Sequence, residues 1–448
     1  MKSALRDVLS GRRLRIITFV CLAVGYLIFL PITLPSVPFH PDEATYIYMS
    51  RDLDRILADG PLSLCWRRGG GADPLQIERE RDCPLTRYAI GLARLAGGLP
   101  ATDANWNWSL DWDRNLEQGA VPSDRLLLWA RIPEALFLFV SVLLLARIGG
   151  RLGGGVGAVT AALLYGMNSQ ILLHARRAMS EAGLLFGMIL VVAVLLERRD
   201  AAGPWFRNVI RPSLAGAALA IAVTAKHSGL LMAPVAVLGL FIVDPESSPR
   251  KTLGSGLLRT GVLSLSFLVF FLAANPFYWC DPPGTLSAVA AERQRLMAEQ
   301  IQTLHLASRA AALDSLPARL LAPVYEWLVA PPAFWDVPNF SAATAAAEAA
   351  YASQPLHILT GLPAGGMLFA VAAFAGLGGA AAGLIRRRLD GARFVALAWF
   401  VCSFVGIVVV VPILWQRYYL PLIPAGAALS AAAIGDIVRG IRKRIRQD

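Results

Sequence analysis

Residues 126–147 read LLLWARIPEALFLFVSVLLLAR, a stretch with apolar residues at most positions. A helix of about 20 such residues is long enough to cross the hydrocarbon core of a bilayer. Comparable apolar blocks recur along the 448-residue chain, which is 56% hydrophobic and only 16% charged. Soluble domains do not concentrate apolar residues in blocks of this length. The pattern predicts an all-α integral membrane protein.

The apolar blocks predict a bundle of about ten transmembrane helices within one polytopic membrane domain. Short basic or Gly/Pro-rich segments separate most of the blocks. The two blocks beside Lys226 are too short to cross the hydrocarbon core, so we expect Lys226 to lie in a depression below the outer surface. The domain covers residues 1–448, and the expected spans are 14–35, 126–147, 154–173, 179–196, 212–225, 228–243, 257–274, 356–385, 394–412 and 418–435.

The distribution of Lys and Arg predicts the orientation of the chain. Cytoplasmic loops of membrane proteins carry an excess of basic residues, so we expect both termini in the cytoplasm of a multi-pass plasma (inner) membrane protein. The net charge of +11 then suits the anionic lipids of the inner leaflet, and membrane lipids rather than nucleic acid are the expected partners. No small-residue cleavage site follows the first block, which predicts a retained first helix. The inner segments contain Arg12, Arg151, Arg199, Lys251, Arg387 and Arg442.

Two long segments, residues 36–125 and 275–355, lie on the extracytoplasmic side of this arrangement and are the expected place of function. Within them we expect surface helices at 41–57, 85–95 and 342–350. Cys65 and Cys83 share the first outer segment and can form a disulfide in an oxidising compartment, with Cys280 of the second segment as the competing partner.

Asp42 and Glu43 directly follow the first span and begin a helix. Glycosyl transfer needs a carboxylate near the membrane surface that takes a proton from the attacking hydroxyl, which makes Asp42 a candidate base. The simpler alternative is that both acids only stabilise the helix dipole. Trp106, Trp108 and Trp112 nearby are typical of an interfacial aromatic belt, or they stack on a sugar ring.

Basic residues near the outer leaflet form a second candidate set. Cations there oppose the positive-inside trend and need a partner, for which a lipid-borne phosphate is suitable. The alternatives are lipid headgroups and internal ion pairs, such as Arg177 with Glu181 or Arg131 with Glu134. The set consists of Arg176, Arg177, Lys226, His227 and Arg417.

The sequence contains no clear cofactor or metal motif. None of the five histidines has a metal-ligand spacing to another. A divalent metal is a minor alternative, in which His40 and Asp42 would combine with His227 or Glu43.

Three motifs resemble the GT-C superfamily of integral membrane glycosyltransferases, especially its protein O-mannosyltransferase and aminoarabinose-transferase branch. They are FHPDEATY at 39–46, just outside the first span, DCPL at 82–85, and WQRYYLPLIP at 415–424. The large outer loops after the first and seventh spans also match along nearly the whole chain. Some relatives place a Lys where this chain has Cys83, and Arg87 is a possible substitute.

The resemblance implies an inverting, single-displacement hexosyl or pentosyl transfer on the extracytoplasmic face. The donor would be a sugar linked to polyprenyl phosphate, and the acceptor a hydroxyl of a protein, lipid or glycan. Asp42 would be the base and Glu43 a supporting acid, while Arg417 with Lys226 or with Arg176 and Arg177 would hold the donor phosphate. A polyprenyl-lipid or sugar transporter or flippase is the alternative, although the sequence has no duplicated halves. Further candidate substrate-binding residues are Tyr46, Arg87, Tyr418 and His227.

Overall fold

The computed structural model describes residues 11–69, 73–197, 203–242, 249–307, 312–328, 330–337, 340–354, 363–445 and 447. Within these ranges the regular elements are helices, and no β-strand is present. In the first half of the chain the helices are α2 (Gly11–Thr33), α3 (Pro41–Met49), α4 (Arg51–Asp59), η1 (Pro61–Leu64), α5 (Gln76–Arg81), α6 (Pro84–Ala96), α7 (Trp112–Glu117), α8 (Asp124–Gly166), α9 (Ser169–His174), α10 (Glu181–Leu195), η2 (Phe206–Ile210) and α11 (Arg211–Ala225). In the second half they are η3 (His227–Leu231), α12 (Met232–Ile242), α13 (Pro249–Ala274), η4 (Pro276–Tyr278), α14 (Pro282–Ala307), α15 (Leu316–Leu328), α16 (Ser341–Ala352), α17 (Pro363–Ile385), α18 (Gly391–Val410), η8 (Gln416–Tyr418) and α19 (Leu422–Ile445).

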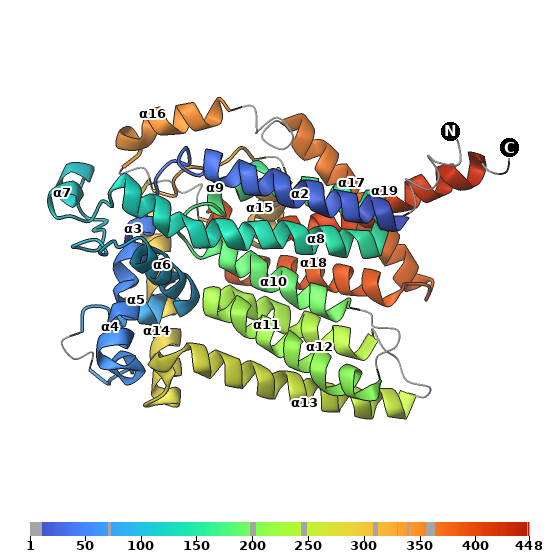
Figure 1. Cartoon of the computed structure of the whole chain (residues 1–448), viewed down its shortest axis with the longest axis horizontal. Coiled ribbons are helices and arrows are strands. Elements are labelled where there is room, and N and C mark those ends of the chain that lie inside the picture. Colours follow the sequence, from blue (N-terminus) through green and yellow to red (C-terminus); the bar gives the residue numbers. More distant parts are fainter. Residues whose placement is uncertain are drawn as a thin grey trace.

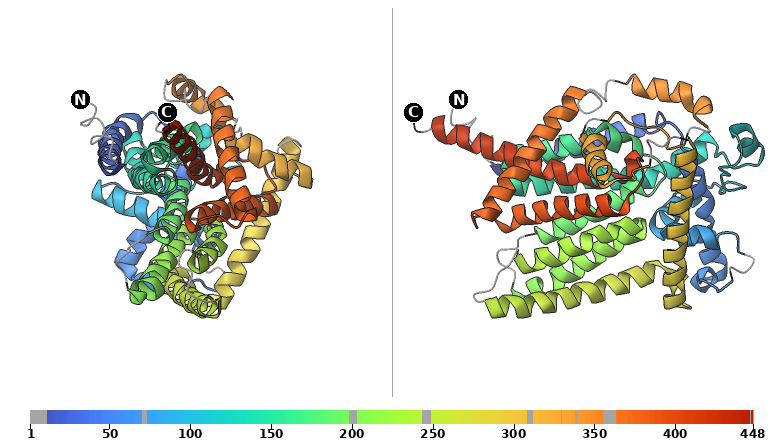
Figure 2. Two further views of the ribbon diagram at one scale, coloured as in Figure 1. Left: turned by 90° about the vertical axis from the view of Figure 1, so that its right-hand side faces the viewer. Right: turned by 180° about the vertical axis from the view of Figure 1, so that it is seen from behind.

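The long apolar helices form one lengthwise bundle, and the outer helices collect at one of its ends (Figure 1). Six helices of the described residues are long and apolar enough to cross a membrane. At the end with the outer helices, which we call the site end, α5 packs against α14, and α14 runs across the bundle axis (Figure 2). Helix α2 begins and α19 ends at the opposite end. The all-α membrane architecture predicted from the sequence is confirmed.

Helix α8 contains two of the predicted spans, joined by a sharp reversal at Gly154. This residue has a φ of 72°, which glycine adopts without steric cost. A Cβ built on Gly149 would lie 2.6 Å from the Cβ of Ala161, although these residues would be about 18 Å apart in one straight helix. The segments before and after Gly154 are therefore antiparallel neighbours. Each of the ten predicted spans overlaps a helix, while the number that cross a membrane stays a prediction.

The break predicted around Lys226 is present in the structure. Helix α11 ends at Ala225, Lys226 is extended with φ −157° and ψ 140°, and a single 3₁₀ segment leads into α12. The Lys226 side chain reaches Glu181 in the first turn of α10. The fold thus places a cation at the site end of the bundle.

The first outer helix is shorter than predicted. The sequence suggested one helix over 41–57, but the chain breaks at Ser50 between α3 and α4. Arg94 of α6 explains the break, because its Nε donates to the Ser50 hydroxyl at 2.7 Å and its Nη2 to the Ser50 carbonyl at 3.2 Å. Met49 is buried in the protein, whereas Leu57 is 69% exposed. The helices predicted at 85–95 and 342–350 are confirmed as α6 and α16.

The disulfide joins the two outer segments rather than lying within the first one. Cys65 is bonded to Cys280, and Cys83 is a free, buried thiol. Of the two pairings that the sequence left open, the one with the competing partner Cys280 is therefore present and the Cys65–Cys83 bridge is not. The backbone explains the pairing, since the Trp66 amide donates to the Phe277 carbonyl at 3.0 Å and brings the two cysteines together. Burial raises the pKa of the Cys83 thiol to about 12, which keeps it protonated.

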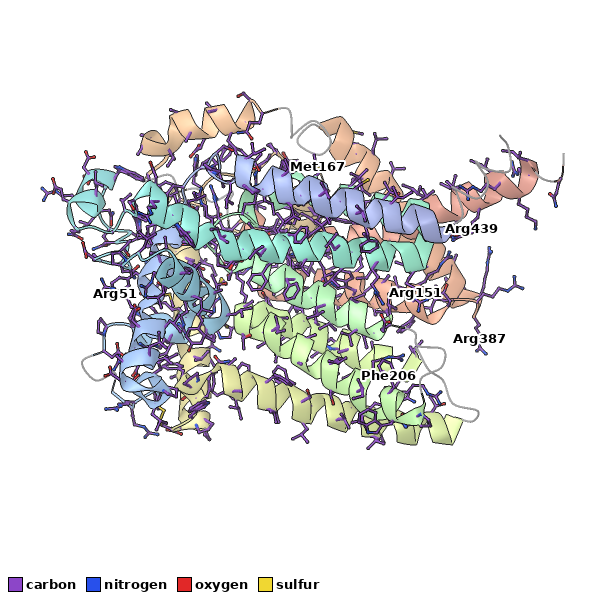
Figure 3. The ribbon with its side chains drawn as sticks, viewed as in Figure 1. Arg51, Arg151, Met167, Phe206, Arg387 and Arg439 are labelled. Carbon is purple, nitrogen blue, oxygen red and sulfur yellow. A yellow bond between two sulfur atoms is a disulfide. The ribbon has the colours of Figure 1, made fainter. Side chains whose placement is uncertain are left out.

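Basic side chains lie at both ends of the bundle. Arg151, Arg387 and Arg439 lie at the end where α19 finishes, opposite to Arg51 among the outer helices (Figure 3). Arg51 is bonded within the protein, donating to the carbonyl of Asp103 at 3.2 Å. This distribution agrees with the sequence-based orientation, which stays a prediction.

Candidate functional site

A cavity of about 530 Å³ lies between the outer helices and the site end of the bundle. Its walls come from α3, α5, the 105–109 loop, α10, α14 and the segments that precede α16 and α19. Both long outer segments, which the sequence suggested as the place of function, therefore contribute to it. Its lining includes Asp42, Tyr46, Asp82, Glu181, Lys226, Arg293, Glu299, Asp336, Trp415, Arg417 and Tyr418.

Asp42 enters the cavity from the first turn of α3. Pro41 begins the helix, and the His40 ring caps it, because its Nδ1 accepts a hydrogen bond from the Asp42 amide at 3.2 Å. Glu43 completes a capping box by accepting from the His40 amide at 3.0 Å. The Asp42 side chain keeps 21% exposure. Pro41 and the His40 cap thus fix the Asp42 carboxylate at the positive, N-terminal end of α3.

Glu43 points away from the cavity and is fully buried. Its carboxylate accepts from Arg131 Nε at 2.7 Å, from Arg131 Nη2 at 2.8 Å and from the Ala178 amide at 2.8 Å. The expected supporting acid is therefore part of a buried ion pair that anchors α3 to α8. The suggested Arg131–Glu134 pair is wrong, since Glu134 instead accepts from the Gly183 amide at 3.1 Å.

Arg417 is the cation nearest to Asp42. Its Nη1 donates to Asp42 Oδ2, and its Nε lies 2.9 Å from Asp336 Oδ2. The guanidinium also lies 5.3 Å from the Trp415 ring centroid and 5.8 Å from that of Tyr418. The two carboxylates raise the pKa of Arg417 against the opposing effect of burial, so the residue stays charged.

Lys226 is a second cation of the cavity. Its Nζ donates to Glu181 Oε1 at 2.8 Å and lies 5.0 Å from the centroid of the Tyr418 ring. The suggested Arg177–Glu181 pair is wrong, because Glu181 is paired with Lys226. Tyr418 therefore lies against both cations.

Two other predicted basic residues are held in internal hydrogen bonds outside the cavity lining. Arg176 donates to Thr33 Oγ1 at 2.7 Å and to the Tyr351 hydroxyl at 2.8 Å. Arg177 donates to the carbonyls of Pro38 at 3.1 Å and Phe334 at 2.8 Å.

Arg87 pairs with buried Asp52, with its Nε 3.2 Å from Asp52 Oδ2, and it is absent from the cavity lining. His227 begins η3 next to Lys226 and is also absent from the lining.

Tyr46 contributes a hydroxyl to the cavity. It donates to Asp82 Oδ1 at 2.9 Å, which joins α3 to the start of α6. Burial and the Asp82 charge raise the pKa of Tyr46, so the phenol stays neutral and acts as a donor.

The suggested metal set does not assemble. Glu43 is occupied by Arg131, and Nδ1 of His40 accepts from a backbone amide. Burial and the charges of Arg177 and Arg417 lower the pKa of His40, so its ring is neutral. Among the residues that the structure describes, no three His, Cys, Asp or Glu side chains are grouped in a way that could hold a metal ion.

Sequence reasoning missed Asp336 as a member of the site. It belongs to the 331–340 stretch between α15 and α16, where no helical pattern or paired charge singled it out. The same holds for α14, whose Arg293 and Glu299 line the cavity. Burial raises the pKa of Asp336, although Arg417 opposes this effect.

Comparison with known proteins identifies the fold. No protein-family model and no curated protein matches the chain. Solved structures do match. The oligosaccharyltransferase of Archaeoglobus fulgidus in its apo form has 13% sequence identity and a TM-score of 0.51, over 97% of this chain and 52% of that one. The structure of AglB from the same organism with an inhibitory peptide and a dolichol-phosphate has 14% identity and a TM-score of 0.51, over 97% and 51%.

A more distant match is the protein O-mannosyltransferase complex of S. cerevisiae bound to its sugar donor. It has 14% identity and a TM-score of 0.42, over 58% of this chain and 33% of that one. The chain therefore shares the fold of the two archaeal oligosaccharyltransferase structures. It spans about half the length of the archaeal structures that it matches.

Proposed function

We propose that the protein is a glycosyltransferase that moves a sugar from a polyprenyl-phosphate-linked donor to an acceptor hydroxyl. The observation that carries this proposal is the cavity in which Asp42 at a helix N-terminus lies against Arg417, beside Lys226. One carboxylate and two cations are what such a reaction requires at one place. The dolichol-phosphate in the AglB structure supports a lipid phosphate as the donor group.

Asp42 acts as the general base in this proposal. The acceptor hydroxyl oxygen bonds to the anomeric carbon while its proton passes to the Asp42 carboxylate. On the opposite face the bond between the anomeric carbon and the phosphate oxygen breaks, and its electron pair leaves with the phosphate. The product is a glycoside of inverted configuration together with polyprenyl phosphate.

Arg417 and Lys226 stabilise the leaving phosphate, which gains negative charge as the glycosidic bond breaks. Both cations are held by rings as well as by acids, since Tyr418 lies beside each of them. Their acids, Asp42 and Glu181, give up these contacts when a phosphate enters. Donor binding therefore also releases Asp42 from its ion pair.

The proposed orientation follows from the two ends of the bundle. With the end near Arg387 and Arg439 in the cytoplasm, the cavity opens on the extracytoplasmic face of the plasma membrane. The Cys65–Cys280 disulfide at the site end suits an oxidising compartment. Donors carried by polyprenyl lipids are accessible there without nucleotide sugars.

The test is transfer of radiolabelled sugar from a panel of polyprenyl-phosphate-linked hexoses and pentoses by the purified protein. Asp42→Asn removes the base but keeps an oxygen acceptor for Arg417, so we expect loss of transfer with the fold and donor binding retained. Arg417→Ala should weaken binding of polyprenyl phosphate. Asp59→Asn, at the exposed end of α4, is the matched control.

Two outcomes would overturn the proposal. Full transfer by a folded Asp42→Asn variant would remove the base. If wild-type protein turned over no donor, but carried the intact lipid-linked sugar across vesicle membranes, the protein would be a flippase instead.

A further inference from the structure

Asp336 reaches the cavity from the second outer segment, and the proposed reaction does not yet use it. Its side chain is only 7% exposed and lines the cavity together with Asp42. Burying a carboxylate is costly unless a cation compensates it, and the nearest cation is Arg417. The burial of the Asp336 carboxylate therefore depends on the Arg417 guanidinium.

Arg417 presents two different edges to the two acids. Its Nη1 donates to Asp42, while its Nε lies 2.9 Å from Asp336. The contact with Asp336 is an ion pair and not an aligned hydrogen bond, since neither Arg417 Nε nor Asp336 Oδ2 has a hydrogen-bond partner. Because a guanidinium is a rigid plane with separate edges, this ion pair at the Nε edge can persist while the Nη groups change partner. A lysine in this place could not keep two acids apart in this way.

His40 links Asp336 to the same turn of helix that carries Asp42. Since Nδ1 of the neutral ring accepts from the Asp42 amide, the ring proton is on Nε2. That atom faces Asp336 Oδ2 at 3.8 Å. Asp42, Arg417, Asp336 and His40 thus lie in one cluster, to which both outer segments contribute.

We propose that Asp336 is a positioning residue that holds Arg417 by its Nε while the Nη groups pass from Asp42 to the donor phosphate. This inference rests on the proposed function. Asp336 does not touch the reacting atoms. Its effect is to give Arg417 a permanent anchor, so that the loss of the Asp42 contact does not release the side chain from the cavity.

The absence of this anchor has a specific consequence for catalysis. In Asp336→Asn the Arg417 guanidinium loses its anchor at Nε, so its Nη groups are held less often where they stabilise the leaving phosphate. The cavity also loses one negative charge, which favours an anionic ligand. We therefore expect kcat to fall by about ten-fold or more, while binding of polyprenyl phosphate stays equal or becomes tighter.

A purely structural role predicts the opposite pattern, because a disordered cavity would bind phosphate less well. The experiment measures kcat for donor turnover, Kd for polyprenyl phosphate and thermal stability for wild type, Asp336→Asn, Asp336→Glu and the Asp59→Asn control. The longer acid in Asp336→Glu keeps the charge and should restore part of kcat.

The outcomes separate this inference from the proposed function. Wild-type protein without donor turnover would refute the proposed function itself. Active wild-type protein with an unchanged kcat in Asp336→Asn would overturn only the inference. Weaker polyprenyl phosphate binding together with a lower kcat would also overturn it, since Asp336 would then simply maintain the cavity.

Discussion

Glu43 offers the clearest test of the physical reasoning, since it lies next to Asp42 and yet has a different environment. Its two oxygens accept four hydrogen bonds, two from Arg131, one from the His40 amide and one from the Ala178 amide. Glu43→Gln keeps the size of the side chain but removes the charge. It also places an amide donor where all the neighbours are donors. We expect this variant to be strongly destabilised.

The magnitude follows from the burial of the pair. Glu43 is 0% and Arg131 2% exposed, so the substitution leaves a buried guanidinium without its counter-charge. Breaking a buried ion pair by removing one partner costs about 3–5 kcal/mol. In Glu43→Gln combined with Arg131→Met the unpaired charge is gone, and about 1–3 kcal/mol should be recovered relative to Glu43→Gln alone.

The assay is unfolding of the purified variants in mixed micelles with increasing denaturing detergent, followed by circular dichroism. Asp42→Asn is the matched control, because Arg417 keeps Asp336 and the free energy of unfolding should change by less than about 2 kcal/mol. If Glu43→Gln lost sugar transfer but kept wild-type stability, this reasoning would be refuted. Glu43 would then take part in the transfer reaction itself.

Three further predictions test other contacts at the site end. Lys226→Met should weaken polyprenyl phosphate binding by about ten-fold, and adding Glu181→Gln should restore the stability lost but not the binding, as measured by titration. Cys65→Ser, or reduction of the Cys65–Cys280 bond, should lower the temperature of inactivation, whereas Cys83→Ser should not, because Cys83 is a free thiol. For His40, burial lowers the pKa below its ordinary 6.5, so the unfolded chain binds a proton that the folded chain does not. Wild-type stability should therefore fall as the pH drops below about 6.5, and less so in His40→Asn, which keeps an oxygen cap; identical pH profiles would contradict this.

Most helices could be predicted from sequence because their determinants are local. Apolar blocks, Pro41 at a helix start and the reversal-prone glycines before Gly154 each act within a few residues. The break at Ser50 could not be predicted in this way, because Arg94 of another helix holds it. Similarly, Cys280 pairs with Cys65 because η1 and η4 are adjacent, which depends on the path of the whole outer segment.

Helix geometry alone could show that Asp42 and Glu43 face different surroundings, but not which of them faces the cavity. Consecutive residues of an α-helix project about 100° apart, so two adjacent acids in the first turn do not both face one cavity. The sequence could show that one acid would face the protein, but not which one. The contacts with Arg131 and Ala178, both distant in sequence, decide this. Asp336 had no local signal at all, since its partners lie in other segments.

The pairing of the cavity cations also bears on how the proposed reaction would be controlled. Lys226 and Arg417 each hold an acid, so an arriving phosphate must compete with Glu181 and Asp42. That competition costs donor affinity, because part of the attraction replaces contacts that already exist. In return, Asp42 becomes a free base only when a phosphate has taken its place on Arg417. An acceptor that arrives first meets a carboxylate still engaged with the guanidinium, so the site favours proton transfer after the donor is bound.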